Sequence, residues 1–121
     1  CDTRELFLMK DYPKKESIVN YLFDLGISEI IVTKGFFGST IYSKEKDRTV
    51  IPPFIPNKIV DTTGCGDTYA AIYAFARYKG YSIYHAGLLA SAGSGIKTEK
   101  TGLLTKSFTK IKIRVNPICQ I

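Results

Sequence analysis

The chain has 121 residues, of which 45% are hydrophobic and 23% charged, as in a typical folded domain and unlike a disordered segment. No apolar run reaches the ~18 residues that a membrane-spanning helix needs, so no transmembrane segment is expected. Lysine and arginine outnumber aspartate and glutamate by 17 to 11, and this net charge of +6 suggests an anionic partner. The basic residues are scattered, however, which favours an ordinary solvated surface.

The cysteines and the first residue bear on the cellular setting and on whether the chain is part of a longer protein. Cys1, Cys65 and Cys119 are odd in number and lack the paired spacing of a disulfide framework or a zinc site, so we expect a reducing, cytoplasmic setting. The chain starts with Cys1 and shows no leader pattern, so we expect a fragment or processed piece of a longer protein. Without internal repeats or linkers, residues 1–121 are predicted to form one unit.

The first predicted element is a helix over residues 14–26. Apolar residues recur there at spacings of three and four, and Gly26 supplies a C-terminal stop. The β-branched run at residues 29–33 then predicts a strand of the kind that is buried in a parallel sheet. A helix that leads into such a strand is half of a βαβ unit.

A β-hairpin is predicted next. Residues 39–43 alternate between apolar and polar side chains, residues 44–48 form a charged turn, and residues 49–54 return as a second strand. Three prolines close the hairpin: Pro52, Pro53 and Pro56.

Two helices and a basic strand complete the prediction. Residues 66–78 are apolar almost all round, which indicates a central helix sandwiched between layers. A second helix should run from the N-cap Ser82 towards Ile96. Residues 110–115 alternate with a period of two and predict a basic edge strand.

The most informative stretch is the glycine-rich turn at residues 60–68, which leads straight into the central helix. Gly64 and Gly66 let the backbone fold tightly, and the helix N-terminus directs unpaired N–H groups at the same point, so the turn is suited to bind an anion. The carboxylate of Asp67 would repel that anion, which suggests that it accepts a proton instead. An anion hole beside a base is what phosphoryl transfer to a hydroxyl requires. Alternatively, Asp67 only caps the helix.

Four motifs in order resemble those of the ribokinase-like (PfkB) carbohydrate kinases. Residues 61–67, Asp-Thr-Thr-Gly-Cys-Gly-Asp, resemble the family's D-T-x-G-A-G-D signature. Residues 33–38 are similar to its T-x-G-x-x-G loop, and residues 90–102 to its late A-N-A segment and R-K-G turn. Residues 2–5, Asp-Thr-Arg-Glu, are similar to its N-x-x-E motif.

The resemblance implies a fold and a reaction. The fold is the α/β, Rossmann-like ribokinase fold, of which residues 1–121 would be the C-terminal, nucleotide-binding and catalytic part: a three-layer αβα sandwich with a mostly parallel sheet and a β-hairpin. The reaction is ATP-dependent transfer of the γ-phosphate to a hydroxymethyl group of a sugar or nucleoside. The first strands, the sugar-recognising residues and the lid through which members often form homodimers lie outside this portion.

The resemblance also assigns roles to individual residues. Asp67 would be the catalytic base, and the backbone N–H groups of Gly64, Cys65 and Gly66 would form the anion hole. ATP would lie against Thr33, Gly35, Gly38, Gly66 and Ser91. Asp2 and Glu5 would organise magnesium. A monovalent cation such as K+ would lie at Asp61 and Thr63, with backbone carbonyls near Lys97, Lys100 and Gly102.

Other functions remain as alternatives. The chain could be a noncatalytic nucleotide- or phosphate-binding module. Cys65 at a helix N-terminus could be a nucleophilic thiol paired with His85, the only histidine. A nucleic-acid binder would need aromatic residues interleaved with basic ones, and between Tyr69 and Tyr78 the only basic residue is Arg77. We therefore expect a small-molecule partner, no nucleic acid and no membrane.

Overall fold

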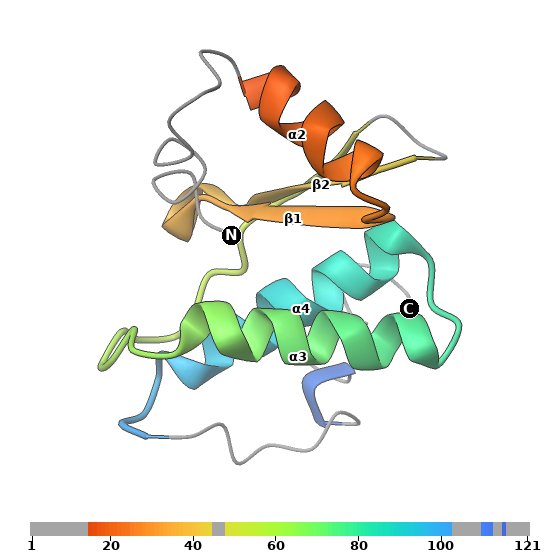
Figure 1. The fold of residues 1–121 in the computed structure, drawn as a ribbon. Coiled ribbons are helices and arrows are strands. Elements are labelled where there is room, and N and C mark those ends of the chain that lie inside the picture. The colour runs from red at the N-terminus through yellow and green to blue at the C-terminus, as the bar shows by residue number, and fades with distance from the viewer. Residues whose placement is uncertain (1–14, 45–47, 103–109, 113–114, 116–121) are drawn as a thin grey trace.

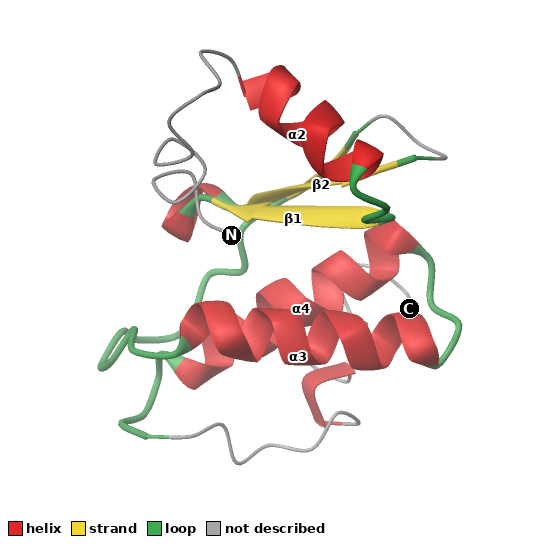
Figure 2. Ribbon diagram, in the orientation of Figure 1, coloured by secondary structure: helices red, strands yellow, loops and turns green. Residues whose placement is uncertain are grey.

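The computed structural model describes residues 15–44, 48–102, 110–112 and 115, and these residues form three layers. Helix α2 covers one face of a small sheet, and helices α3 and α4 cover the other face (Figure 1). The expected αβα layering is therefore confirmed, and Figure 2 shows how loops connect the layers. The elements are α2 (Lys15–Asp24), β1 (Glu29–Thr33), the 3-10 turn η1 (Gly35–Phe37), β2 (Ser39–Ser43), β3 (Thr49–Ile51), α3 (Cys65–Tyr78) and α4 (Ile83–Lys97).

The sheet has the strand order β1-β2-β3 and contains the predicted β-hairpin. Both pairs are antiparallel, with Ile31 opposite Ile41 and Ser39 opposite Ile51. Strand β3 ends before the predicted residue 54 because Pro52 and Pro53 cannot donate to a strand ladder. Within the described residues every strand pair is antiparallel, so they include no parallel neighbour for β1.

Helix α2 ends as the sequence predicts. Gly26 adopts a left-handed conformation with φ 94°. Its N–H donates to the carbonyl of Phe23 at 3.0 Å, and the N–H of Ile27 donates to Leu22 at 3.3 Å. This glycine cap turns the chain back into β1.

The two faces of the sheet bury two separate apolar cores. The smaller core lies under α2 and contains Ile18, Val19, Ile30, Val32 and Tyr42. The larger core lies between the sheet and the helix pair. It includes Ile41 and Ile51 from the hairpin, Tyr69, Ile72 and Tyr73 from α3, and Leu88, Leu89 and Ile96 from α4.

The helix in the interior is α4, and the expectation that the helix at residues 66–78 is sandwiched between layers is wrong for the described part of the chain. One face of α3 is buried, at Tyr69, Ile72, Tyr73 and Ala76, whereas Phe75 on another face is 44% exposed. Ten residues of α4 are buried, and Ser82 caps it by accepting the N–H of His85 at 3.2 Å. The alanines of α3 make its sequence apolar, but an alanine has little apolar surface, so leaving it exposed to water is not costly. The apolar sequence therefore did not require burial on all sides.

The predicted edge strand at residues 110–115 is also wrong. Residues 110–112 and 115 are helical. Ile111 and Val115 are both buried in the larger core. Ile111 and Val115 are four residues apart, so they lie on one face of a helix, and they also lie on one face of a strand. An alternating pattern with this spacing is therefore compatible with a helix as well as with a strand.

The described part of the chain contains no helix with the length and apolar character that crossing a bilayer demands.

Candidate active site

An open pocket of about 720 Å³ lies where the sheet meets the first turn of α3 and the second half of α4. It is lined by segments far apart in the sequence: β1, the η1 loop, the loop after β3, and both helices. The pocket gathers seven of the predicted site residues: Thr33, Gly35, Gly38, Cys65, Gly66, Asp67 and Ser91.

The turn before α3 depends on the backbone freedom of Gly64. This residue is the N-cap of α3 and has φ 77° and ψ 8°, in the left-handed region that glycine tolerates best. Its carbonyl accepts both the N–H and the hydroxyl of Thr68, each at 3.0 Å. The first turn of α3 is thereby closed with its N–H groups directed out of the helix end.

Three backbone N–H groups at this helix end have no acceptor among the described residues: those of Gly64, Gly66 and Asp67. The predicted anion hole consisted of Gly64, Cys65 and Gly66. The N–H of Cys65 instead donates to the carbonyl of Thr62 at 3.3 Å. The set that can receive an anion therefore includes the amide of Asp67, which the motif did not single out.

Asp67 is exposed in the first turn of α3 and lines the pocket together with Gly66. The predicted base and the unpaired N–H groups therefore belong to the same first turn of α3. A hydroxyl bound in this pocket could give a proton to Asp67 while an anion is held by the amides.

The loop that leads into the turn is fixed by Asp61. Its carboxylate accepts the N–H of Thr63 at 2.9 Å and lies 3.8 Å from the ammonium of Lys97. Hydrogen bonds from the backbone and side chain of Thr63 lower the pKa of Asp61, with help from Lys97 and the N–H of Gly102. Asp61, Thr63, Lys97 and Gly102 are therefore neighbours, while Lys100 lies exposed just past the end of α4.

The loop between β1 and β2 forms the opposite wall of the pocket. The N–H of Lys34 donates to the carbonyl of Gly38 at 2.9 Å, and that of Phe37 donates to Lys34 at 3.1 Å. Gly38 has φ 91°, and a Cβ there would collide with the carbonyl oxygen of Ile51. This glycine is required by the close approach of the hairpin backbone.

The hydroxyl of Ser91, which was predicted to contact the nucleotide, forms hydrogen bonds within the protein. It donates to the carbonyl of Pro52 and accepts the N–H of Phe54, both at 3.1 Å. It thereby ties the loop after β3 to α4. Any contact of Ser91 with a ligand must share the hydroxyl with these bonds.

Cys65 joins α3 to α4 through a reciprocal contact with Ser94. The thiol donates to the carbonyl of Ser94 at 3.7 Å, and the Ser94 hydroxyl donates to the carbonyl of Cys65 at 3.1 Å. His85 lies nine residues before Ser94 on the same helix, roughly 13 Å away at 1.5 Å per residue. The alternative of a Cys65–His85 catalytic pair is therefore excluded.

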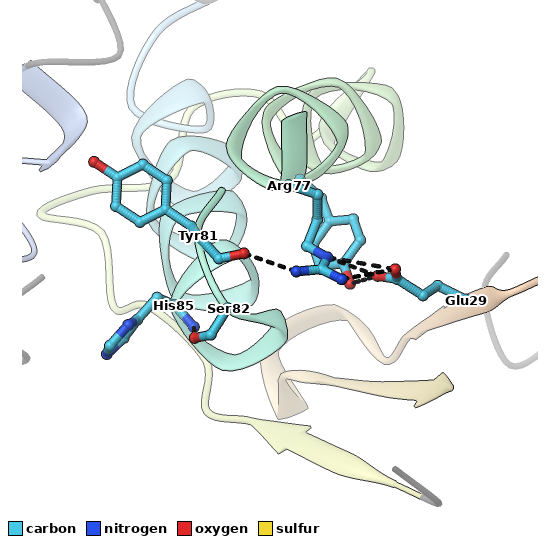
Figure 3. A network of polar contacts seen from close by, with 6 residues as sticks. Glu29, Arg77, Tyr81, Ser82 and His85 are labelled. Atoms are coloured by element: carbon cyan, nitrogen blue, oxygen red, sulfur yellow. Dashed lines mark hydrogen bonds and ion pairs between the residues drawn. The ribbon is translucent and has the colours of Figure 1, made fainter. Parts of the chain in front are cut away.

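One polar network was not predicted from the sequence. The carboxylate of Glu29, at the start of β1, accepts hydrogen bonds from the Tyr73 hydroxyl and from Arg77 at 3.1 Å (Figure 3). Arg77 also donates to the carbonyl of Tyr81 at 2.8 Å. Burial acts to raise the pKa of Glu29, but the bonds from Arg77 and Tyr73 outweigh it and lower the pKa. The network connects the sheet to the end of α3.

The tyrosines of α3 that face the sheet pack against it and form hydrogen bonds. The hydroxyl of Tyr69 pairs with that of Ser39 at 2.6 Å, and burial raises the pKa of Tyr69 to about 12. Burial, together with the hydrogen bond to Glu29, also raises the pKa of Tyr73. Both phenols therefore stay neutral at physiological pH and act as structural groups.

The expected magnesium residues, Asp2 and Glu5, lie outside the described residues. Among the residues that the structure describes, no group of three or more His, Cys, Asp or Glu side chains could hold a metal ion.

Comparison with known proteins identifies a matching family and several relatives. A family model described as pfkB family carbohydrate kinase matches residues 3–110. The nucleoside kinase of Methanocaldococcus jannaschii is 34% identical over 115 residues, which are 92% of this chain and 38% of the relative. The bifunctional protein HldE of Nitratiruptor is 29% identical over 89 residues, 74% of this chain and 19% of the relative. The chain therefore spans less than two-fifths of the length of these relatives.

Solved structures share the fold. The M. jannaschii nucleoside kinase structure matches with a TM-score of 0.79 at 30% identity, covering 96% of this chain and 38% of that one. A ribokinase II from E. coli in complex with ATP and Mg²⁺ matches with a TM-score of 0.86 at 22% identity, with the same coverage. The nucleoside kinase of Burkholderia thailandensis, in complex with inosine, matches at 0.84 and 22% identity over 99% of this chain and 40% of that one.

Proposed function

Because the chain belongs to the pfkB family of carbohydrate kinases, we propose that the protein carrying it transfers the γ-phosphate of ATP to a hydroxymethyl group of a sugar or nucleoside. One observation supports this proposal above the others. Asp67 and the unpaired N–H groups of Gly64, Gly66 and Asp67 belong to one helix end, and Gly66 and Asp67 line the pocket there.

In the proposed reaction the acceptor oxygen attacks the γ-phosphorus, and the bond from that phosphorus to the bridging oxygen of ADP breaks. Asp67 takes the proton that the hydroxyl releases. The amides at the start of α3 stabilise the negative charge on the transferring group, and their fixed direction costs no reorganisation during the reaction. Mg²⁺ bound to the ATP phosphates would offset their charge.

The nucleotide is proposed to lie along the wall formed by Thr33, Gly35 and Gly38. Thr33, Gly35 and Gly38 all line the pocket, and the two glycines have positive φ, a backbone conformation that glycine adopts most readily. Ser91 is proposed to act on ATP only indirectly, by holding the loop after β3 against α4.

Nucleosides come first among the proposed acceptors. The relative with the highest identity described above is a nucleoside kinase, and a structural neighbour binds inosine. The acceptor panel should therefore start with purine nucleosides and continue with ribose and other sugars.

The test is Asp67→Asn in the natural protein at its full length. We expect ATP binding to persist and kcat to fall by about two to four orders of magnitude, the range typical of a lost general base. Calorimetry measures ATP binding, and ADP release together with the phosphorylated product measures transfer.

Asp24→Asn serves as the matched control, because it removes an exposed carboxylate at the far end of α2. Turnover of Asp67→Asn within about twofold of wild type would remove Asp67 from the mechanism. ATP binding by wild type without transfer to any acceptor would instead favour a noncatalytic nucleotide-binding module.

A further inference from the structure

Lys97 is the one charged residue in the buried set of the described chain. It is the last residue of α4, and only 4% of its side chain is exposed. Lysine is almost never buried without a partner, because the free energy needed to remove an ammonium from water is larger than the stabilisation from most contacts. Its burial therefore needs a specific cause in the structure.

The cause lies in the turn before α3. The Lys97 side chain runs beneath Gly64, where a Cβ would lie 3.9 Å from its Cε, and its ammonium reaches to 3.8 Å from the carboxylate of Asp61. A positive charge thus lies directly under the segment that ends in the unpaired N–H groups of α3.

This region is also where the family resemblance implies a monovalent cation, and the residues present do not fit one. The Asp61 carboxylate already accepts the N–H of Thr63 and faces an ammonium, so a second cation there would meet like charge. The carbonyls at the end of α4 already accept hydrogen bonds: Gly95 from Thr98, Ile96 from Glu99, Lys97 from Lys100, and Thr98 from both Val60 and Asp61.

We propose that the ammonium of Lys97 replaces the monovalent cation in this protein. It fixes the turn from Asp61 to Gly64 and adds positive charge beneath the anion hole, so the site is complete without K+. Lys97 is in this view a positioning residue. The inference rests on the proposed kinase function, but the two are tested by different measurements.

The first measurement is the K+ dependence of the full-length wild-type protein. Phosphotransfer is compared in tetramethylammonium chloride and in KCl at equal ionic strength, with Na+ and ammonium excluded. We expect kcat/KM to agree within about twofold. Activation by K+ of tenfold or more would overturn the inference while leaving the kinase function intact.

The second measurement uses variants of Lys97. In the K+-free buffer, Lys97→Ala should lose tenfold or more in kcat/KM and regain most of it with K+ or methylammonium, either of which can enter the vacated space. Lys97→Met keeps the volume without the charge and should lose as much as Lys97→Ala. Lys58→Ala removes an exposed lysine from the loop before the same turn and should change nothing.

Several outcomes of the variant series would contradict the inference. Lys97→Met with wild-type activity would show that the side chain acts by packing alone. A folded Lys97→Ala that is fully active without K+ would show that the ammonium is not needed. A folded Lys97→Ala whose activity neither K+ nor methylammonium restores would show that a cation does not take its place.

Thermal unfolding separates the inference from the proposed function. If no acceptor is phosphorylated under any ionic condition, the function is wrong, and the cation inference is then decided by the melting temperature. We expect K+ in place of tetramethylammonium to leave the wild-type Tm unchanged and to raise that of Lys97→Ala. A K+-specific rise in the wild-type Tm would overturn the inference.

Discussion

Gly38 and Gly35 illustrate how differently two glycines of one loop are constrained. Both have positive φ, 91° and 58°. Around Gly35 nothing lies within 4 Å of an added Cβ, whereas at Gly38 such an atom would collide with the carbonyl oxygen of Ile51 and lie 3.1 Å from the nitrogen of Pro53. Gly35 therefore serves backbone conformation alone, and Gly38 serves both conformation and space.

We expect Gly38→Ala to lower the free energy of unfolding by about 3 kcal/mol and Gly35→Ala by about 1 kcal/mol. The larger loss at Gly38 has two causes: the collision with Ile51, and a backbone conformation (φ 91°, ψ −151°) that is open essentially only to glycine. Urea unfolding of the full-length variants measures both losses. Equal losses would mean that the hairpin backbone moves away from Gly38 at little cost.

Among the elements, β1 and α3 are joined by Glu29, Tyr73 and Arg77 in addition to the apolar core. Glu29 keeps 24% of its side chain exposed and Arg77 keeps 36%, so solvent weakens their attraction without removing it. The two ends of this contact lie 48 residues apart in the sequence.

The lowered pKa of Glu29 makes this contact sensitive to pH. The folded state binds the Glu29 proton less readily than the unfolded chain, whose carboxyl has the ordinary value of 4.5. The stability contributed by Glu29 is therefore fully present above pH 4.5 and is lost as the pH falls through the folded-state pKa.

We expect Glu29→Gln to cost about 1–2 kcal/mol of unfolding free energy near pH 7, the lower part of the range for hydrogen bonds to a charged group, because Arg77 is partly exposed to solvent. The gap between wild type and variant should shrink below pH 4.5, because wild type then also carries a neutral carboxyl. Asp24→Asn is the control. A gap that stays constant down to pH 3 would contradict the assigned charge state.

Over the whole molecule the two cores differ in extent. Among the residues that the structure describes, the core beneath α2 holds five buried residues, whereas the core of the helix pair holds fifteen. Regions with fewer buried contacts open at a lower free energy.

Amide hydrogen exchange of the full-length protein should therefore show α4 exchanging last and α2 well before it. Mass spectrometry of proteolytic fragments from residues 15–24 and 83–97 measures the order. Protection of α2 equal to that of α4 would show that the layers open as one unit.

The sequence predicted features that depend on neighbouring residues, and missed those that depend on distant ones. The turn from Gly64 to Asp67 could be recognised because glycines, acid and helix start are contiguous. The hairpin and the Ser82 cap were found for the same reason. The bonds between Glu29 and Arg77, and between Ser91 and the loop after β3, join segments whose approach only the fold determines.

The interior position of α4 was missed for a related reason. Alanine-rich α3 and glycine-rich α4 both contain small, apolar residues, and periodicity alone cannot say which of two such helices has neighbours on all sides. Lys97 was assigned to the cation region only through its backbone, because nothing local indicates that its ammonium turns inward.

The mutual contact of Cys65 and Ser94 bears on how chemical labelling of this protein should be understood. A maleimide or iodoacetamide adduct on the Cys65 sulfur would push α3 and α4 apart where α3 begins. It would also displace the backbone N–H groups of Gly64, Gly66 and Asp67. If the proposed kinase function holds, inactivation by such reagents and its prevention by ATP would therefore not show that the sulfur takes part in the chemistry.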